Sequence, residues 1–135
     1  MEIKEGSFLY FARKDIILAK HDFSVDMDST CIHCQQAIEN SLKAVIEAKG
    51  EKPPHTHNLT VLTDKTGIES LKELDSDLRF ISSTYFDLRY PGSYAPVTEK
   101  SAKLAIALAE SIYSTCILEI ESICTHYEAT DIFSE

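Results

Sequence analysis

The residues of this chain that are best suited to chemistry include two histidines that follow a proline turn. His55 and His57 stand one residue apart, directly after Pro53 and Pro54. Imidazole titrates near neutral pH, so such a pair can act as acid and base or can bind a metal ion. The pair lacks a third ligand, which a metal site would need. We therefore predict no metal ion and no other cofactor, and a structural or groove-lining role for these side chains.

An arginine among tyrosines is the second candidate. Arg89 stands at the predicted end of a helix, because Pro91 disfavours helical geometry at Tyr90 and Gly92 permits a sharp turn. A guanidinium group in this place can stack on a ring, pair with a carboxylate, or bind a phosphate or a base. The alternative is that Arg89 offsets the dipole of its own helix or pairs with Asp87 or another acid.

Polar side chains also gather on one face of a predicted helix over Ser29–Gly50. The apolar residues of that helix recur at spacings of three and four, which is typical of a helix with one buried face. The polar residues of the second face would border any groove beside the helix. They are Gln35, Gln36, Glu39, Asn40 and Lys43.

The four cysteines fall in segments with helical periodicity, so a secreted disulfide framework is not expected. Cys31 and Cys34 form a CxxC pair, which together with Cys116 and Cys124, or with His33, could in principle bind zinc. Residues three apart on a helix face the same way, and a buried free cysteine packs as a small hydrophobe. We therefore favour reduced thiols that pack in the core.

Helical periodicity extends over most of the chain and sets the order of the elements that must position these groups. It predicts helices over Ser7–His21, Ser29–Gly50, Leu59–Thr66, Ile68–Arg89 and Thr98–Tyr127. The sequence therefore predicts an all-α, up-and-down helical bundle of four long helices plus a short one, forming a single domain over residues 1–135. The wide apolar face of the last helix fits either the middle of such a bundle or half of a subunit interface.

Composition and charge limit the classes of partner. No apolar run approaches the ~18 residues of a membrane span, and the chain begins MEIKEG, so we expect a cytoplasmic protein without a membrane partner. A formal net charge of −9 disfavours a protein that covers nucleic-acid phosphates with lysines. All 13 basic residues lie at or before Lys103, so an anionic ligand is expected to bind that part. The segment Leu104–Glu135 has six acids and suits packing or a protein partner.

Several of these features occur in an order that resembles the HEPN family of small helical proteins. Beyond the amphipathic first helix, the segments that carry the resemblance are Gln35-Gln36-Ala37-Ile38-Glu39, Leu42-Lys43-Ala44, Thr56-His57-Asn58-Leu59 after the proline turn, and Arg89-Tyr90-Pro91 before the last helix. The similarity extends from Phe8 to about Tyr127. Each segment alone is unspecific, but their order and separations are more specific. Asn40 departs from the family, which often has Lys there, so one potential anion contact is missing.

The resemblance implies a bundle that forms homodimers. Many HEPN proteins are ribonucleases, and others bind a minimal nucleotidyltransferase encoded nearby in a toxin-antitoxin-like pair, the kind indicated here by Arg89-Tyr90-Pro91. The ribonucleases share an arginine followed four to six residues later by histidine. Arg89 matches that arginine, but no histidine follows it until His126.

Metal-independent cleavage of RNA needs a base, an acid and a cation on the phosphate. Arg89 supplies only the cation. We therefore favour a binding protein without its own catalysis, whose groove accepts a nucleotide, an RNA end or a nucleotidyltransferase partner. The alternatives are a metal-independent endoribonuclease that uses Arg89 with His57, and a purely structural homodimer. The predicted binding residues are Gln36, Lys43, His57, Arg89 and Tyr90.

Overall fold

The protein is an all-α bundle, as the sequence predicts. The computed structural model describes residues 1–130, apart from the side chains of Ser93 and residues 125–130. Within this part of the chain there are no strands. The helices are α1 (Phe8–Asp22), α2 (Met27–Ala48), α3 (Leu59–Thr66), α4 (Asp75–Arg89) and α5 (Glu99–Thr130), with short 3-10 turns η1 (Glu69–Leu74) and η2 (Pro91–Ser93) on either side of α4.

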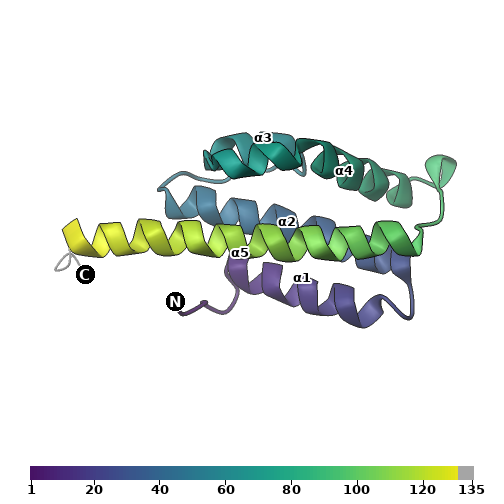
Figure 1. Cartoon of the computed structure of the whole chain (residues 1–135), viewed down its shortest axis with the longest axis horizontal. Coiled ribbons are helices and arrows are strands. Elements are labelled where there is room, and N and C mark those ends of the chain that lie inside the picture. The colour runs from purple at the N-terminus through teal and green to yellow at the C-terminus, as the bar shows by residue number, and fades with distance from the viewer. Residues whose placement is uncertain (131–135) are drawn as a thin grey trace.

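Helix α2 lies at the centre of the bundle and packs against each of the other four α-helices. Figure 1 shows α1 on one side of α2 and α5, and α3 with α4 on the other side. The long helices α1, α2, α4 and α5 alternate in direction, so the topology is up-and-down (Figure 1). The loop that follows α2 turns back and runs beside the middle of α2. There the end of the loop, just before α3, contacts the polar face of α2.

The ends of α3 follow from two residues that the sequence marks. Asn58 caps the start, because its Oδ1 accepts hydrogen bonds from the backbone N–H groups of Thr60 at 3.0 Å and Val61 at 3.2 Å. Gly67 ends the helix in the left-handed region with φ of 70°, which a residue with a Cβ rarely adopts. A Cβ there would also lie 3.1 Å from Nζ of Lys49. The predicted bounds of α3 are confirmed.

The start of α2 differs from the predicted helix, which begins at Ser29. Asp26 is the cap, and it accepts a hydrogen bond from the backbone N–H of Asp28 at 3.0 Å. The helix begins earlier because Asp26 already satisfies a free N–H, which leaves Met27 free to pack against the core. The carboxylate of Asp28 instead accepts a hydrogen bond from Oη of Tyr94 at 2.8 Å, which ties the turn before α5 to α2.

The predicted long helix over Ile68–Arg89 is wrong in its first part, which forms the separate 3-10 turn η1. Ile68, Leu71 and Leu74 recur at a spacing of three, which matches the repeat of a 3-10 helix. From Leu74 onward the apolar spacing alternates between three and four, as in the α-helix that follows.

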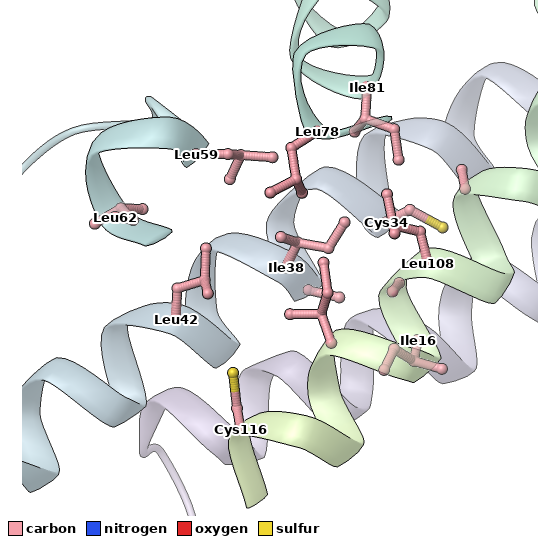
Figure 2. Close-up of a cluster of buried hydrophobic side chains, with 14 of the residues drawn as sticks. Ile16, Cys34, Ile38, Leu42, Leu59, Leu62, Leu78, Ile81, Leu108 and Cys116 are labelled. Atoms are coloured by element: carbon pink, nitrogen blue, oxygen red, sulfur yellow. The ribbon is translucent and has the colours of Figure 1, made fainter. Parts of the chain in front are cut away.

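The core is continuous between α2 and its neighbours. Figure 2 shows Leu59 of α3 and Leu78 of α4 pointing toward one another and toward Ile38 of α2. Cys31, Cys34 and Cys116 are buried among these side chains, as predicted for packing thiols. The same prediction is wrong for Cys124, which is exposed because it lines an open hollow between the end of α5 and the N-terminal segment instead of packing in the core. In the portion of the chain that the structure describes, no helix has both the length and the apolarity to span a membrane.

Candidate functional site

Helix α2 presents one buried carboxylate to two basic side chains. Glu39 Oε1 lies 2.8 Å from Nδ1 of His57, and Oε2 lies 3.0 Å from Nζ of Lys43. The side chains of Glu39 and Lys43 are only 11% and 12% exposed, whereas that of His57 is 67% exposed. Lys43 stands one helical turn after Glu39, so its charge is taken up by this carboxylate. The exposed member of the group is therefore the imidazole.

Gln35 holds the backbone of the same histidine. Its Nε2 donates a hydrogen bond to the carbonyl oxygen of His57 at 3.2 Å. Gln35 is buried, and its Oε1 has no hydrogen-bond partner among the residues that the structure describes. Two residues one turn apart on α2 thus fix both the main chain and the ring of His57. This is why a residue in a loop has a defined orientation.

The contact with Glu39 assigns the two ring nitrogens of His57. Nδ1 faces the carboxylate, so in the neutral ring the hydrogen-bonded tautomer carries its proton on Nδ1 and leaves a lone pair on Nε2. A carboxylate that orients an imidazole in this way is the arrangement that prepares a general base. In the protonated ring, Nε2 becomes a donor that can bind an anion.

His57 lines a hollow at the surface of the bundle. This hollow, of about 370 Å³, is lined by residues from the start of α3 and from the middle of α4, where the loop before α3 passes α4. Its lining residues are His57, Asn58, Thr60, Arg79 and Ser82.

A second hollow of about 390 Å³ continues the first, because Thr60 and Arg79 line both. Thr63 also lines the second hollow, and its buried Oγ1 has no hydrogen-bond partner among the described residues. We call the two together the α3–α4 groove. The polar residues that line it are His57, Asn58, Thr60, Thr63, Asp64, Lys72, Asp75, Arg79 and Ser82.

Arg79 brings a cation to the groove. Its Nε donates a hydrogen bond to Oδ2 of Asp75 at 2.7 Å, one turn earlier on α4. This hydrogen bond to Asp75 raises the pKa of the guanidinium, which stays positively charged. Because Nε is the atom engaged, both terminal NH₂ groups are free of hydrogen bonds to the side chains and backbone that the structure describes. They form the fork that binds phosphate or carboxylate in a bidentate manner.

Arg89 and Tyr90 lie elsewhere, at the far end of α4. Nη1 of Arg89 donates to Oη of Tyr85 at 3.1 Å, and its guanidinium carbon lies 5.2 Å from the centre of the Tyr85 ring. The ring of Tyr90 lies 4.3 Å from that of Phe86. Among the described side chains Arg89 forms no ion pair with an acid, and it does not line the α3–α4 groove.

The structure therefore does not bring His57 and Arg89 together. Arg79 and Arg89 are ten residues apart on one helix, which is about 15 Å along its axis. The cation beside His57 is Arg79, which sequence reasoning missed. Its position four residues after Asp75 and three before Ser82 indicates an exposed helix face. Nothing in the sequence indicates that the loop before α3 returns to cover that face.

The other predicted residues do not line the α3–α4 groove. Gln36 is half-buried on α2, and its side chain makes no hydrogen bond to any residue of the described chain. Lys43 touches the site only through Glu39. His55 is exposed. Among the side chains that the structure describes, no three of His, Cys, Asp or Glu come close enough together to bind a metal ion.

The chain was compared with protein families, with curated proteins and with solved structures. The HEPN domain family matches residues 7–121, which run from the N-cap of α1 through most of α5 and include the whole groove. No curated protein and no solved structure matches the chain. The family match extends over well more than half of the sequence and agrees with the all-α bundle. The chain therefore belongs to the HEPN domain family.

Proposed function

We propose that this HEPN protein binds a phosphate-bearing ligand, a nucleotide or an RNA end, in the α3–α4 groove, without catalysis of its own. The observation that carries the proposal is that His57 and Arg79, from two different elements, line one hollow of about 370 Å³. Sites for small molecules typically enclose ~300–1,000 Å³, so the hollow is large enough for a phosphate and part of its sugar.

The groove offers several donors to an anion. Arg79 can contact two phosphate oxygens through its terminal NH₂ groups, and His57 can donate from Nε2 when it is protonated. The hydroxyl groups of Thr60 and Ser82 line the same hollow. The N–H groups of Thr60 and Val61 at the start of α3 are already bonded to Asn58, so side chains would carry most of the recognition.

In this site the predicted binding residues have different roles from those that the sequence suggested. His57 remains a ligand-binding residue. Arg79, and not Arg89, supplies the cation that contacts the phosphate. Lys43 supports His57 through Glu39 instead of touching the ligand. Gln36 and Tyr90 remain predictions from the family resemblance.

Titration calorimetry with ATP and with a short 5′-phosphorylated RNA tests the proposal. We expect Arg79→Ala to weaken binding at least tenfold, because it removes the permanently charged side chain from the lining of the first hollow. Arg13→Ala, which removes an exposed arginine of α1, is the matched control and should leave binding unchanged. Unchanged binding in Arg79→Ala would contradict the groove. Loss of binding in Arg89→Ala instead would move the site to the end of α4.

Cleavage of RNA is the second candidate, favoured by the contact between Glu39 and His57. His57 would take the proton of a 2′-hydroxyl, the 2′-oxygen would attack phosphorus, and the 5′-oxygen would leave with a proton from an acid. The groove has one imidazole, and Lys43 is already paired, so no described residue clearly supplies that acid. Incubation of RNA with the protein and a chelator, repeated with His57→Ala, decides between the candidates. Intact RNA at high protein concentration would rule out cleavage.

A minimal nucleotidyltransferase partner is a separate proposal, supported by the surface at the end of α4. Phe86 and Tyr90 are exposed there with their rings in contact, and Arg89 lies beside them. Exposed aromatic and arginine side chains are enriched in protein interfaces. Co-purification with a nucleotidyltransferase encoded nearby, compared between the wild type and Tyr90→Ala, tests this partner. Capture that Tyr90→Ala does not reduce would place the contact elsewhere.

A further inference from the structure

The two hollows of the α3–α4 groove differ in charge. The first hollow is lined by the basic side chains of His57 and Arg79 and by no acid of the described chain. The second hollow shares Arg79 with the first, but two carboxylates, Asp64 and Asp75, also line it. A ligand that extends through both hollows must therefore carry negative charge at one end and hydrogen-bond donors at the other.

The carboxylates of the second hollow have acceptor atoms to spare. Asp75 uses Oδ2 for its hydrogen bond to Nε of Arg79, so its Oδ1 is free of hydrogen bonds from the described residues. The side chain of Asp64 makes no ion pair and no hydrogen bond with these residues. The hydrogen bond and charge of Asp75 are the main causes that raise the pKa of Arg79, and the nearby charge of Asp64 also raises it. Lys72 donates to Oε1 of Glu69 at 3.1 Å, so its charge is already taken up.

A buried hydroxyl group in the wall of the second hollow also lacks a partner. Thr63 is 6% exposed, and its Oγ1 makes no hydrogen bond with any described residue. Buried polar groups without a partner are unfavourable and uncommon in folded proteins. Threonine in a helix occupies two χ1 rotamers, so rotation about the Cα–Cβ bond can turn this hydroxyl toward the hollow. The hydroxyl can thus gain from a ligand the hydrogen bond that it lacks in the free protein.

We propose that the second hollow binds the ribose of the ligand through a free 2′,3′-diol, with Asp64 and Asp75 accepting hydrogen bonds from the two hydroxyls. This inference rests on the proposed function, in which Arg79 contacts the 5′-phosphate. A carboxylate that binds a ribose hydroxyl is known from dinucleotide-binding folds. The groove therefore selects a ribonucleotide whose 3′-oxygen is free, either a nucleoside 5′-phosphate or the last nucleotide at the 3′ end of an RNA.

The same carboxylates exclude a chain that continues past this sugar. A phosphate on the 3′-oxygen would replace the donor hydrogen and bring a negative charge against Asp64 and Asp75. The first nucleotide of an RNA and every internal nucleotide carry such a phosphate. The groove should therefore reject both.

Titration calorimetry with adenosine ligands that differ at one position tests the inference. We expect 2′-deoxy-AMP to bind at least about threefold more weakly than AMP, because one hydrogen bond to a charged acceptor is lost. Adenosine 3′,5′-bisphosphate should bind at least about tenfold more weakly than AMP, because its 3′-phosphate meets the carboxylates.

A change of charge at Asp64 checks the cause of this selectivity. Asp64→Asn keeps the size of the side chain and removes its charge, so the difference between AMP and the bisphosphate should shrink at least about threefold. Asp77→Asn makes the same chemical change at an acid that does not line the groove, and should leave the difference as it is in the wild type. An undiminished difference in Asp64→Asn would overturn the role of this carboxylate.

Thr63→Val separates contact with the ligand from a structural role. Valine has nearly the same shape without the hydroxyl, and that hydroxyl has no partner among the described residues, so the melting temperature of the free protein should stay unchanged or rise. Binding of AMP should nevertheless weaken at least about threefold. Unchanged binding of AMP in this variant would contradict a ribose in the second hollow.

An adenosine dinucleotide with a free 3′ end, compared with AMP, distinguishes the two sources of a free diol. Dinucleotide binding at least as tight as that of AMP would identify the 3′ end of an RNA, and binding of AMP alone would identify a free nucleotide. The same dinucleotide with a 3′-phosphate should bind more weakly than the dinucleotide with a free 3′ end, and equal binding of the two would count against the inference.

The failure of this inference differs from the failure of the proposed function. If AMP does not bind, or binds equally well to Arg79→Ala, the proposed function is wrong. If AMP binds through Arg79 but 2′-deoxy-AMP and the bisphosphate bind as tightly as AMP, the groove still holds the phosphate and only the assignment of the ribose is wrong.

Discussion

Glu39 accepts a hydrogen bond from Nδ1 of His57 at 2.8 Å, across 18 residues of sequence. One carboxylate on the central helix thereby fixes an imidazole in a loop. The same carboxylate neutralises Lys43, so it serves both the stability of the bundle and the orientation of the groove. Changes at this position are expected to affect both properties.

Replacement of Glu39 by alanine should lower the free energy of unfolding by about 1–3 kcal/mol, because it leaves the largely buried Lys43 without its partner. Urea unfolding followed by circular dichroism measures the change. Glu69→Ala is the control, since its pair with Lys72 is exposed and worth less than about 1 kcal/mol. Equal effects of the two substitutions would show that the burial of the Glu39 pair is unimportant.

The core beside the site should be sensitive to truncation. Ile38 is fully buried, and Ile38→Ala is expected to cost about 2–5 kcal/mol, through lost burial and the cavity that remains. Ile17→Ala, at an exposed isoleucine of α1, should change stability by less than about 0.5 kcal/mol. Thermal unfolding of both variants measures the difference. A loss below about 1 kcal/mol for Ile38→Ala would contradict the packing of α2 described above.

The thiols should differ in reactivity. Burial raises the pKa of Cys31 to about 11, and burial raises the pKa of Cys34 and of Cys116 to about 12. The reactive form is the thiolate, so these three thiols stay protonated and unreactive at neutral pH. Titration of the native protein with a thiol reagent at pH 8 should modify only the exposed Cys124. Rapid modification of a second cysteine before unfolding would contradict this.

Stability should fall with rising pH because of one carboxyl group. Burial raises the pKa of Asp15 above 3.8, although contacts with His33 and Asn40 oppose the shift. The carboxyl of Asp15 therefore binds its proton more tightly in the folded state than in the unfolded state. Ionisation of Asp15 lowers the free energy of unfolding as pH rises through the folded pKa. Asp15→Asn removes the effect, so its stability relative to the wild type should improve as pH rises from the unfolded pKa of an aspartate, about 3.9, through the folded pKa of Asp15.

A second variant checks the cause of that dependence. His33 lies 3.0 Å from Oδ1 of Asp15 and lowers the pKa of Asp15. In a His33→Gln background the pKa of Asp15 should rise further, and the advantage of Asp15→Asn should extend to higher pH. An advantage that is independent of pH in both backgrounds would show that Asp15 does not titrate in this range.

Much of the fold could be predicted from the local rules of helix formation. Asn58 and Gly67 bound α3 as the sequence predicts, because a side-chain cap and a left-handed glycine act within a few residues. The break between η1 and α4 was missed although Ile68, Leu71 and Leu74 carry the spacing of three. A short 3-10 turn and an α-helix share that spacing over two turns, so periodicity alone does not separate them.

The groove could be predicted only in part. The sequence marks His57 as a candidate because histidine can act as acid, base or ligand. Arg79 has no such signal, since an arginine on a predicted helix is usually an exposed surface residue. What makes Arg79 a groove residue is the path of the loop before α3, which Gln35 and Glu39 fix by contacts over 18 residues or more. Such contacts leave no periodic signal. Sequence reasoning therefore selected the arginine next to the conspicuous turn, at the other end of α4.

Ile38 and Glu39 are consecutive residues of α2, one in the core and the other holding His57. Any rotation or shift of α2 that accommodates a new core side chain must also move the carboxylate. The interior and the proposed ligand site of this protein therefore cannot diverge independently during evolution. Homologues that repack the bundle around α2 should carry compensating changes at the positions of Gln35, Glu39 and His57.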